Sequence, residues 1–237
     1  MTKHITLPSV LTESAWFYKD NEELCKPHIG KYYISYSSVN AWENPQYRPE
    51  FIRSKFAGIK HPTGIYAKFG SWCGFALEWG QFPIENPDKF SGEKNIKLDK
   101  VRPENAVYEK MILIDRGTYI IVGFIDMCHE YEPSTLHVRD QKTGGKGKHV
   151  EYESESYIQV ILYAHALEQQ GYKIGKTDVY FIRRTGSHVS PPLTISEEQF
   201  IIPIKYNKDR VEYALNKVDR VVGEISDLYK IYLKYFK

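Results

Sequence analysis

The segment Tyr119-Ile-Ile-Val-Gly-Phe-Ile-Asp126-Met-Cys128 is an apolar run interrupted by a single carboxylate. β-Branched and aromatic residues dominate it, and it lacks the polar face of a surface helix. It therefore predicts a buried strand with Asp126 near its end. Residues 107–114 and the turn at 115–118 predict that this strand is the second arm of a hairpin. A carboxylate at the end of a buried strand needs a partner, because burial removes it from water.

A second strand-like run, Thr135-Leu-His-Val-Arg-Asp140-Gln-Lys142, follows along the chain and ends at a pair of glycines that breaks it. Residues two apart on a strand point to the same face, so Asp140 and Lys142 are expected to share one face. Gln141 turns to the other face. If the run pairs with the preceding strand as a hairpin, Asp126 converges with Asp140 and Lys142 at one end of the sheet.

This convergence would suit a metal-dependent phosphodiesterase. Two carboxylates side by side repel each other unless a divalent cation lies between them, and all-oxygen ligation suits Mg²⁺ or Mn²⁺ better than zinc. Lys142 would then position or deprotonate the attacking water, while the metal would stabilise charge on the phosphorane-like transition state. Taken alone, the same residues also fit a solvated strand end at the start of a turn.

Two segments that flank these strands predict helices. Residues 68–80 form a short apolar stretch that ends at a glycine, with Glu78 one turn after Gly74. An ordinary surface glutamate is the alternative interpretation of Glu78. Residues 155–167 predict a helix capped by a later glycine, with Gln159 and Tyr163 at i and i+4 on one face. The alternative is that these two residues border an apolar helix face. The polar, proline-punctuated segment 82–103 predicts a connection rather than a core element.

The four pieces occur in one order: Gly74-x-x-x-Glu78, Gly123-x-x-Asp126, Asp140-x-Lys142-Thr-Gly and Gln159-x-x-x-Tyr163. This ordered set closely resembles the RecB-like branch of the PD-(D/E)xK nuclease superfamily, where the same motifs frame a metal site in a helix, strand, strand, helix core. The resemblance covers roughly residues 33–184, because residues 34–42 are similar to the serine-rich helix start that opens many such domains.

The resemblance implies an α/β fold with a restriction-endonuclease-like core, in which a central mixed β-sheet is flanked by helices. It also implies that Glu78, Asp126 and Asp140 are the acidic metal-site residues. Gln141 would offer its backbone carbonyl to the metal, and Lys142 would be the catalytic lysine. The implied cofactor is Mg²⁺ or Mn²⁺.

The same resemblance implies that Gln159 and Tyr163 orient the lysine or touch the DNA backbone. The chain departs from its relatives at Gly74, where many of them have a histidine as an extra metal ligand. Some relatives hold an iron–sulfur cluster with four cysteines, but this chain has three scattered cysteines, so no such cluster is expected.

Several residues are candidates for contacting nucleic acid. A flexible basic loop follows the proposed lysine, and its alternative interpretation is a solvated hairpin tip. A basic pair closes a later strand, and a serine lies in the serine-rich helix start. These candidates are Lys146, Lys148, Arg183, Arg184 and Ser37.

The composition predicts one large domain. The chain has 237 residues, of which 42% are apolar, enough to build a substantial core. We predict a single nuclease domain over residues 1–237, with a core of about 33–205 and a C-terminal helix of about 207–236. The net charge of +2 does not by itself indicate nucleic-acid binding. No apolar run approaches a membrane span, no signal-peptide pattern appears, and unclustered cysteines favour the cytoplasm.

The predicted function is a Mg²⁺-dependent deoxyribonuclease that acts in DNA recombination, repair or replication. An exonuclease is favoured over a sequence-specific endonuclease by the resemblance and by the lack of a visible base-reading module. The expected partner is DNA, single-stranded or with free ends, together with a helicase or recombination protein acting in trans. The alternative is a catalytically silent nuclease fold that binds nucleic acid or assembles a complex. The oligomeric state is left open.

Overall fold

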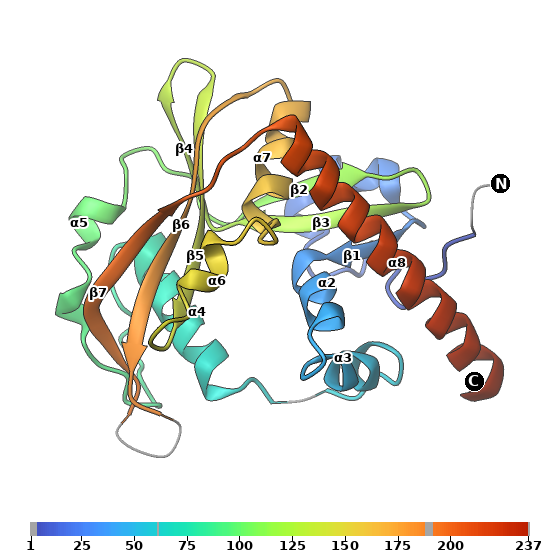
Figure 1. Cartoon of the computed structure of the whole chain (residues 1–237), viewed down its shortest axis with the longest axis horizontal. Helices are drawn as coiled ribbons and strands as arrows, with labels where there is room; N and C mark the ends of the chain where they lie inside the picture. Colours follow the sequence, from blue (N-terminus) through green and yellow to red (C-terminus); the bar gives the residue numbers. More distant parts are fainter. Residues whose placement is uncertain (1–3, 61, 188–191, 237) are drawn as a thin grey trace. The chain divides into compact units, whose positions relative to one another are not determined.

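The computed structural model describes residues 4–60, 62–187 and 192–236, which divide into two compact units (Figure 1). The first unit contains the chain before Pro62, residues Met111–Gly123 and the chain after Val211. The second contains Pro62–Lys110 and Phe124–Val211. The single nuclease domain expected from the sequence stays a prediction.

A three-stranded sheet forms the centre of the first unit. Its order is β1 (Tyr32–Ser35), β3 (Tyr119–Ile125) and β2 (Lys110–Asp115), with β1 parallel to β3. The adjacency of β2 and β3 confirms the predicted hairpin, and six of the seven β3 residues are buried. Short helices precede the sheet: η1 (Lys19–Asn21), α1 (Glu22–Cys25) and η2 (Lys26–His28).

Two further helices follow β1 directly, α2 (Tyr36–Glu43) and α3 (Arg48–Lys55). The side chain of Ser35 accepts a hydrogen bond from the Ser38 backbone N–H and so caps the start of α2. This capping explains why a serine-rich segment begins a helix at this point.

The C-terminal helix, α8 (Lys208–Phe236), confirms the prediction made from its apolar spacing. Val218, Val222 and Ile225 are buried along one face of it. Within the first unit, Asp219 on α8 accepts hydrogen bonds from Arg116 Nη2 at 2.6 Å and from the Tyr119 hydroxyl at 2.5 Å. These bonds fasten the helix to the β2–β3 hairpin. No helix in the described ranges is both long and apolar enough to cross a membrane.

The second unit contains a mixed four-stranded sheet (Figure 1). Its strands are β4 (Met127–Glu132), β5 (Thr135–Gly144), β6 (Lys173–Thr185) and β7 (Thr194–Pro203), in that order. β5 runs antiparallel to β4 and parallel to β6, and β7 is antiparallel to β6. The connection from β5 to β6 contains α6 (Val150–Glu153) and α7 (Gln159–Gln169), as a parallel pair requires. The predicted mixed sheet flanked by helices is confirmed.

Helix α4 (Ile65–Trp79) buries one face against this sheet. Phe69, Trp72 and Leu77 pack with Tyr180 and Ile182 of β6 in one apolar cluster. The helix ends at Gly80, whose φ of 75° lies in the left-handed region that glycine adopts without strain.

The segment between α4 and β2 also joins this core, which contradicts the prediction of a mere connection. It forms η3 (Glu93–Asn95) and α5 (Leu98–Val101), and it buries Phe90 and Ile96 in the same apolar cluster. The sequence reasoning followed its prolines and polar residues, but two well-spaced apolar side chains suffice to anchor an irregular segment.

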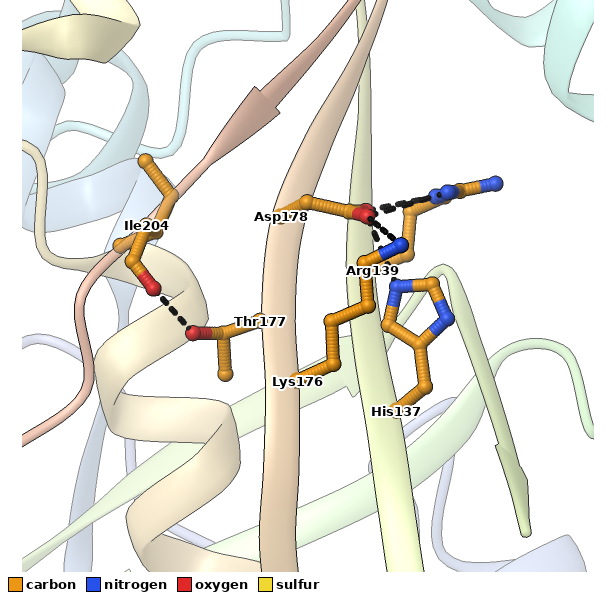
Figure 2. Close-up of polar contacts among 6 residues, drawn as sticks. All are labelled: His137, Arg139, Lys176, Thr177, Asp178 and Ile204. Atoms are coloured by element: carbon orange, nitrogen blue, oxygen red, sulfur yellow. Dashed lines mark hydrogen bonds and ion pairs between the residues drawn. The ribbon is translucent and has the colours of Figure 1, made fainter. Parts of the chain in front are cut away.

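Asp178 on β6 is the centre of a buried ion cluster (Figure 2). Its carboxylate accepts hydrogen bonds from Arg139 Nε at 2.6 Å and Nη2 at 3.0 Å. His137 Nε2 lies 2.9 Å and Lys176 Nζ 3.3 Å from the same carboxylate. Burial opposes ionisation of Asp178, yet the hydrogen bonds from His137 and Arg139 outweigh it and hold the pKa of the carboxyl below its usual range. The cluster therefore fixes the register of β5 against β6.

Candidate active site

Asp140 and Lys142 lie on the same face of β5, as their spacing predicts. Asp140 is fully buried, and its Oδ2 is 2.6 Å from Lys142 Nζ. The same ammonium donates to the Gln141 carbonyl at 3.3 Å. Burial opposes the charge on Lys142, but the carboxylates of Asp140 and then Asp126 outweigh it, so the pKa of the lysine is raised. Lys142 is therefore an ammonium at neutral pH.

Asp126 occupies the bend between β3 and β4, and the hairpin register brings it beside Asp140. Met127, the next residue, pairs with Arg139 across β4 and β5. Asp126 Oδ2 accepts a hydrogen bond from the Gln141 backbone N–H at 2.5 Å. Burial, and then the negative charge of Asp140, raise the pKa of Asp126 well above its usual value. The carboxylates of Asp126 and Asp140 thus repel each other, and the Lys142 ammonium is the cation that attracts both.

A hydrogen-bonded relay connects the start of α7 to Asp140. The Tyr157 hydroxyl donates to Asp140 Oδ2 and lies 3.3 Å from Gln159 Oε1. Gln159 Nε2 in turn donates to the Tyr163 hydroxyl at 2.6 Å. The contacts thus run from Tyr163 through Gln159, Tyr157 and Asp140 to Lys142. The i, i+4 spacing of Gln159 and Tyr163 alone does not reveal this order.

The sequence reasoning missed Tyr157, because it placed this residue inside a helix. The helix begins instead at Gln159, since the Ser154 hydroxyl accepts from the Ser156 backbone N–H and holds a turn there. The turn frees the tyrosine ring to reach β5. The one sequence signal for a role of Tyr157 is its position two residues before the Gln159-x-x-x-Tyr163 motif.

A cavity of about 500 Å³ opens beside these residues within the second unit. Asp126, Gln141 and Lys142 line it together with Glu78 from α4 and with Glu109. The sequence reasoning also missed Glu109. Its φ of 50° is in the left-handed region, which is uncommon for a residue with a side chain. Burial of its carboxyl, and then the charge of Glu78, raise the pKa of Glu109.

The last turn of α4 positions Glu78 on the cavity wall. Arg102 donates from Nε to the Leu77 carbonyl at 2.6 Å and from Nη2 to the Glu78 carbonyl at 2.7 Å. These bonds satisfy two carbonyls that a helix end leaves open. Gly74, one turn earlier, also lines the cavity, and a Cβ added there would meet no atom within 4 Å.

The oxygen donors of Asp126, Asp140 and Gln141 fit a hard divalent cation in chemistry, and of these Asp126 and Gln141 line the cavity whereas Asp140 is buried outside its lining. Asp126 and Asp140 carboxylates and the Gln141 carbonyl are oxygen ligands of the kind Mg²⁺ takes. Asp140 Oδ1 is buried and has no hydrogen-bond partner among the described residues. Over the same residues, no three Asp, Glu, His or Cys side chains gather closely enough to form a metal site. The positive charge next to Asp140 is instead the Lys142 ammonium.

The predicted nucleic-acid contacts lie at several places. Lys146 is exposed after β5, and Lys148 Nζ pairs with Glu151 Oε1 at 2.6 Å. On β6, Arg183 pairs with Glu198, and the Arg184 guanidinium lies over the Tyr66 ring at 3.8 Å. Ser37 belongs to the first unit, where its hydroxyl is 2.9 Å from that of Ser35. None of these placements tests a nucleic-acid contact, so all five stay predictions.

A model of the PD-(D/E)XK nuclease superfamily matches residues 86–230. The match contains Asp126, Asp140 and Lys142 together with the Gln159 and Tyr163 pair, whereas Glu78 precedes it. The comparison with curated proteins finds no match.

Solved structures that are similar to the chain include the following two. A crystal structure from Eubacterium rectale, of a protein proposed to be an exonuclease, is 15% identical with a TM-score of 0.53. The alignment covers 94% of this chain and 87% of that one, which shows a shared fold. The structure of SSO0001 is also 15% identical and covers 86% of this chain and 84% of that one. Its TM-score of 0.43 is too low to establish that the two chains share a fold.

Proposed function

This chain belongs to the PD-(D/E)XK nuclease superfamily, and on that basis we propose that it is a deoxyribonuclease dependent on Mg²⁺ or Mn²⁺. The observation that carries the proposal is the juxtaposition of Lys142 with two carboxylates. Lys142 Nζ is 2.6 Å from Asp140 Oδ2. Asp126 accepts a hydrogen bond from the backbone N–H of Gln141, the residue between Asp140 and Lys142 in the chain. Superfamily membership supports a phosphodiester as the bond that water would attack next to these residues.

Glu78, Asp126, Asp140 and the Gln141 carbonyl would hold the divalent cation, and Glu78 lines the same cavity as Asp126 and Gln141. When bound, the cation supplies positive charge to phosphate oxygens and lowers the pKa of water. Lys142 would donate from Nζ to the attacking water or to a phosphate oxygen, because its raised pKa keeps it protonated.

Tyr157 and Gln159 would act as positioning residues for this chemistry. The Tyr157 hydroxyl restrains Asp140, and the Gln159 side chain bridges Tyr157 to Tyr163. The bond from Tyr157 restrains Asp140 Oδ2 next to Lys142, while Asp140 Oδ1 has no hydrogen-bond partner among the described residues.

We further propose exonucleolytic action in DNA recombination, repair or replication, with a helicase or recombination protein as partner. The structural neighbour proposed to be an exonuclease supports this mode of action through the shared fold. The second candidate is a silent nuclease fold that binds nucleic acid. It is favoured by the finding that, among the described residues, no three Asp, Glu, His or Cys side chains gather closely enough to form a metal site.

Cleavage of end-labelled linear DNA should require Mg²⁺ or Mn²⁺ and fall at least about 100-fold in EDTA, because charge on the phosphate is then unneutralised. A closed circle of the same sequence should resist, and a matched RNA strand should be cut more slowly. Asp126→Asn protein purified in the same way controls for contaminating nucleases. Cleavage in EDTA would refute the metal dependence, and equal cutting of the circle would refute the exonuclease.

A further inference from the structure

The C-terminal end of helix α8 carries a short row of exposed apolar side chains, which we call the outer strip. Leu228, Ile231 and Tyr235 have 37%, 53% and 67% of their surface accessible. Because an α-helix turns by about 100° per residue, their spacing of three and then four positions places them within an arc of about 60°. Such a spacing is also that of the contact line between two helices of a coiled coil.

Other sides of the same stretch of α8 already have partners within the first unit. The Tyr229 ring packs on the Phe56 ring with centroids 4.8 Å apart. On a further side, the Ser226 hydroxyl accepts a hydrogen bond from the Thr6 backbone N–H at 2.9 Å. The outer strip takes no part in this packing, and adjacent exposed apolar side chains mark an interaction surface.

Two opposite charges border the outer strip on one side. Asp227 and Lys234 are both exposed, and a separation of seven residues returns them to the same side of the helix. Two antiparallel helices can place Leu228 opposite Ile231 of the second copy. In this register the aspartate of each copy lies across from the lysine of the other, so the strip is complementary to itself in charge.

We propose that the outer strip is the surface through which two copies of this chain associate, with their α8 helices antiparallel. Leu228 of each copy packs on Ile231 of the other, and a two-fold axis makes this contact occur twice. Asp227 of each copy pairs with Lys234 of the other. A parallel copy would give the aspartate no lysine across the interface. One acidic and one basic border residue also suit a second copy better than an anionic surface.

The small size of the outer strip predicts a weak dimer. Permanent dimers bury about 2,000 Å² or more, which a strip of three side chains on each copy does not supply. We therefore expect a concentration-dependent dimer with a dissociation constant on the order of tens of micromolar. Exposed ion pairs add little affinity, so the charges act mainly on the orientation of the two helices.

Sedimentation equilibrium of the full chain tests the association. The wild type should have the mass of one chain when dilute and approach the mass of two chains as its concentration rises. Ile231→Asp should weaken the dimer at least about 100-fold, because it places a carboxylate in the apolar contact of both copies. Ile29→Asp is the matched control, since Ile29 is an exposed isoleucine of the first unit outside α8. It should dimerise as the wild type does, and thermal melting confirms that each variant is folded.

Charge reversal tests the antiparallel register. Lys234→Glu sets two carboxylates against each other in both pairs, so it should weaken the dimer about tenfold. Asp227→Lys/Lys234→Glu protein restores opposite charges across the interface and should dimerise as the wild type does. A double variant that dimerises no better than Lys234→Glu would overturn the register.

A wild type that stays monomeric at every concentration, or an Ile231→Asp protein that dimerises undiminished, would overturn the proposal. So would flotation of monomeric wild type with vesicles of phosphatidylcholine and phosphatidylserine, because the strip would then be a membrane contact. The sedimentation measurements contain neither DNA nor metal, so they stand apart from the proposed function. Cleavage by a monomer would refute the dimer alone, and a dimer without cleavage would refute the enzyme alone.

Discussion

Asp126→Asn is expected to lower the rate of DNA cleavage by about three orders of magnitude, about 4 kcal/mol in activation free energy. Asparagine keeps an oxygen that can accept the Gln141 backbone N–H, which Asp126 now accepts at 2.5 Å. It removes the negative charge that would hold the cation. Because that charge is also repelled by Asp140, its loss should leave the melting temperature unchanged or higher.

Single-turnover cleavage at saturating protein, together with thermal melting, measures both effects. Asp99→Asn is the matched control, since Asp99 is an exposed carboxylate of the second unit and its loss should change neither quantity. A loss of activity that parallels a loss of melting temperature would show a structural role instead. Full activity in the Asp126→Asn protein would exclude the carboxylate from the reaction.

Arg139→Ala is expected to lower the free energy of unfolding by about 3 kcal/mol, because it removes the main partner of a buried carboxylate. Arg139 makes two hydrogen bonds to Asp178, which is fully buried (Figure 2). His137 and Lys176 remain, which places the loss at the lower end of the range for a broken buried pair. Urea unfolding of the variant and the wild type gives the difference.

Arg220→Ala is the control for this prediction, because Arg220 pairs with Glu43 and Glu224 on the exposed surface, where ion pairs contribute at most about 1 kcal/mol. The pH dependence of the free energy of unfolding gives a second check on the Asp178 cluster. A lowered folded-state pKa means that Asp178 contributes stability above its unfolded pKa of about 3.9. That contribution should disappear as the pH falls below this value. Equal losses for the two arginines would contradict the account of the cluster.

The elements that local patterns define were predictable from the sequence. The buried strand ending near Asp126 and the helix ending at Gly80 each depend on residues adjacent in the chain. The shared face of Asp140 and Lys142 follows from strand periodicity alone. Such features need no knowledge of the rest of the fold.

Features that depend on distant segments were not predictable in the same way. Arg139 meets Asp178, 39 residues further along the chain, because β5 and β6 pair in parallel. Glu109 reaches the cavity from a left-handed backbone position that no local pattern indicates. Tyr157 reaches Asp140 because a serine turn delays the start of α7.

The proposed metal site depends on more than the motifs. The motifs bring Asp126, Asp140 and Lys142 together, yet no three metal-binding side chains cluster within the described residues. How closely Glu78 approaches the two aspartates depends on how α4 packs on the sheet, which no local pattern specifies.

The rate of cleavage of end-labelled DNA by wild-type and Lys142→Ala protein, each with Mg²⁺ and with EDTA, decides whether this chain is a metal-dependent nuclease that acts through Lys142. We expect cleavage by the wild type in Mg²⁺ alone and a loss of at least about 100-fold in the variant, the scale on which one positioned proton-transfer or charge-stabilising group acts. Mg²⁺-dependent cleavage that survives Lys142→Ala undiminished would contradict it.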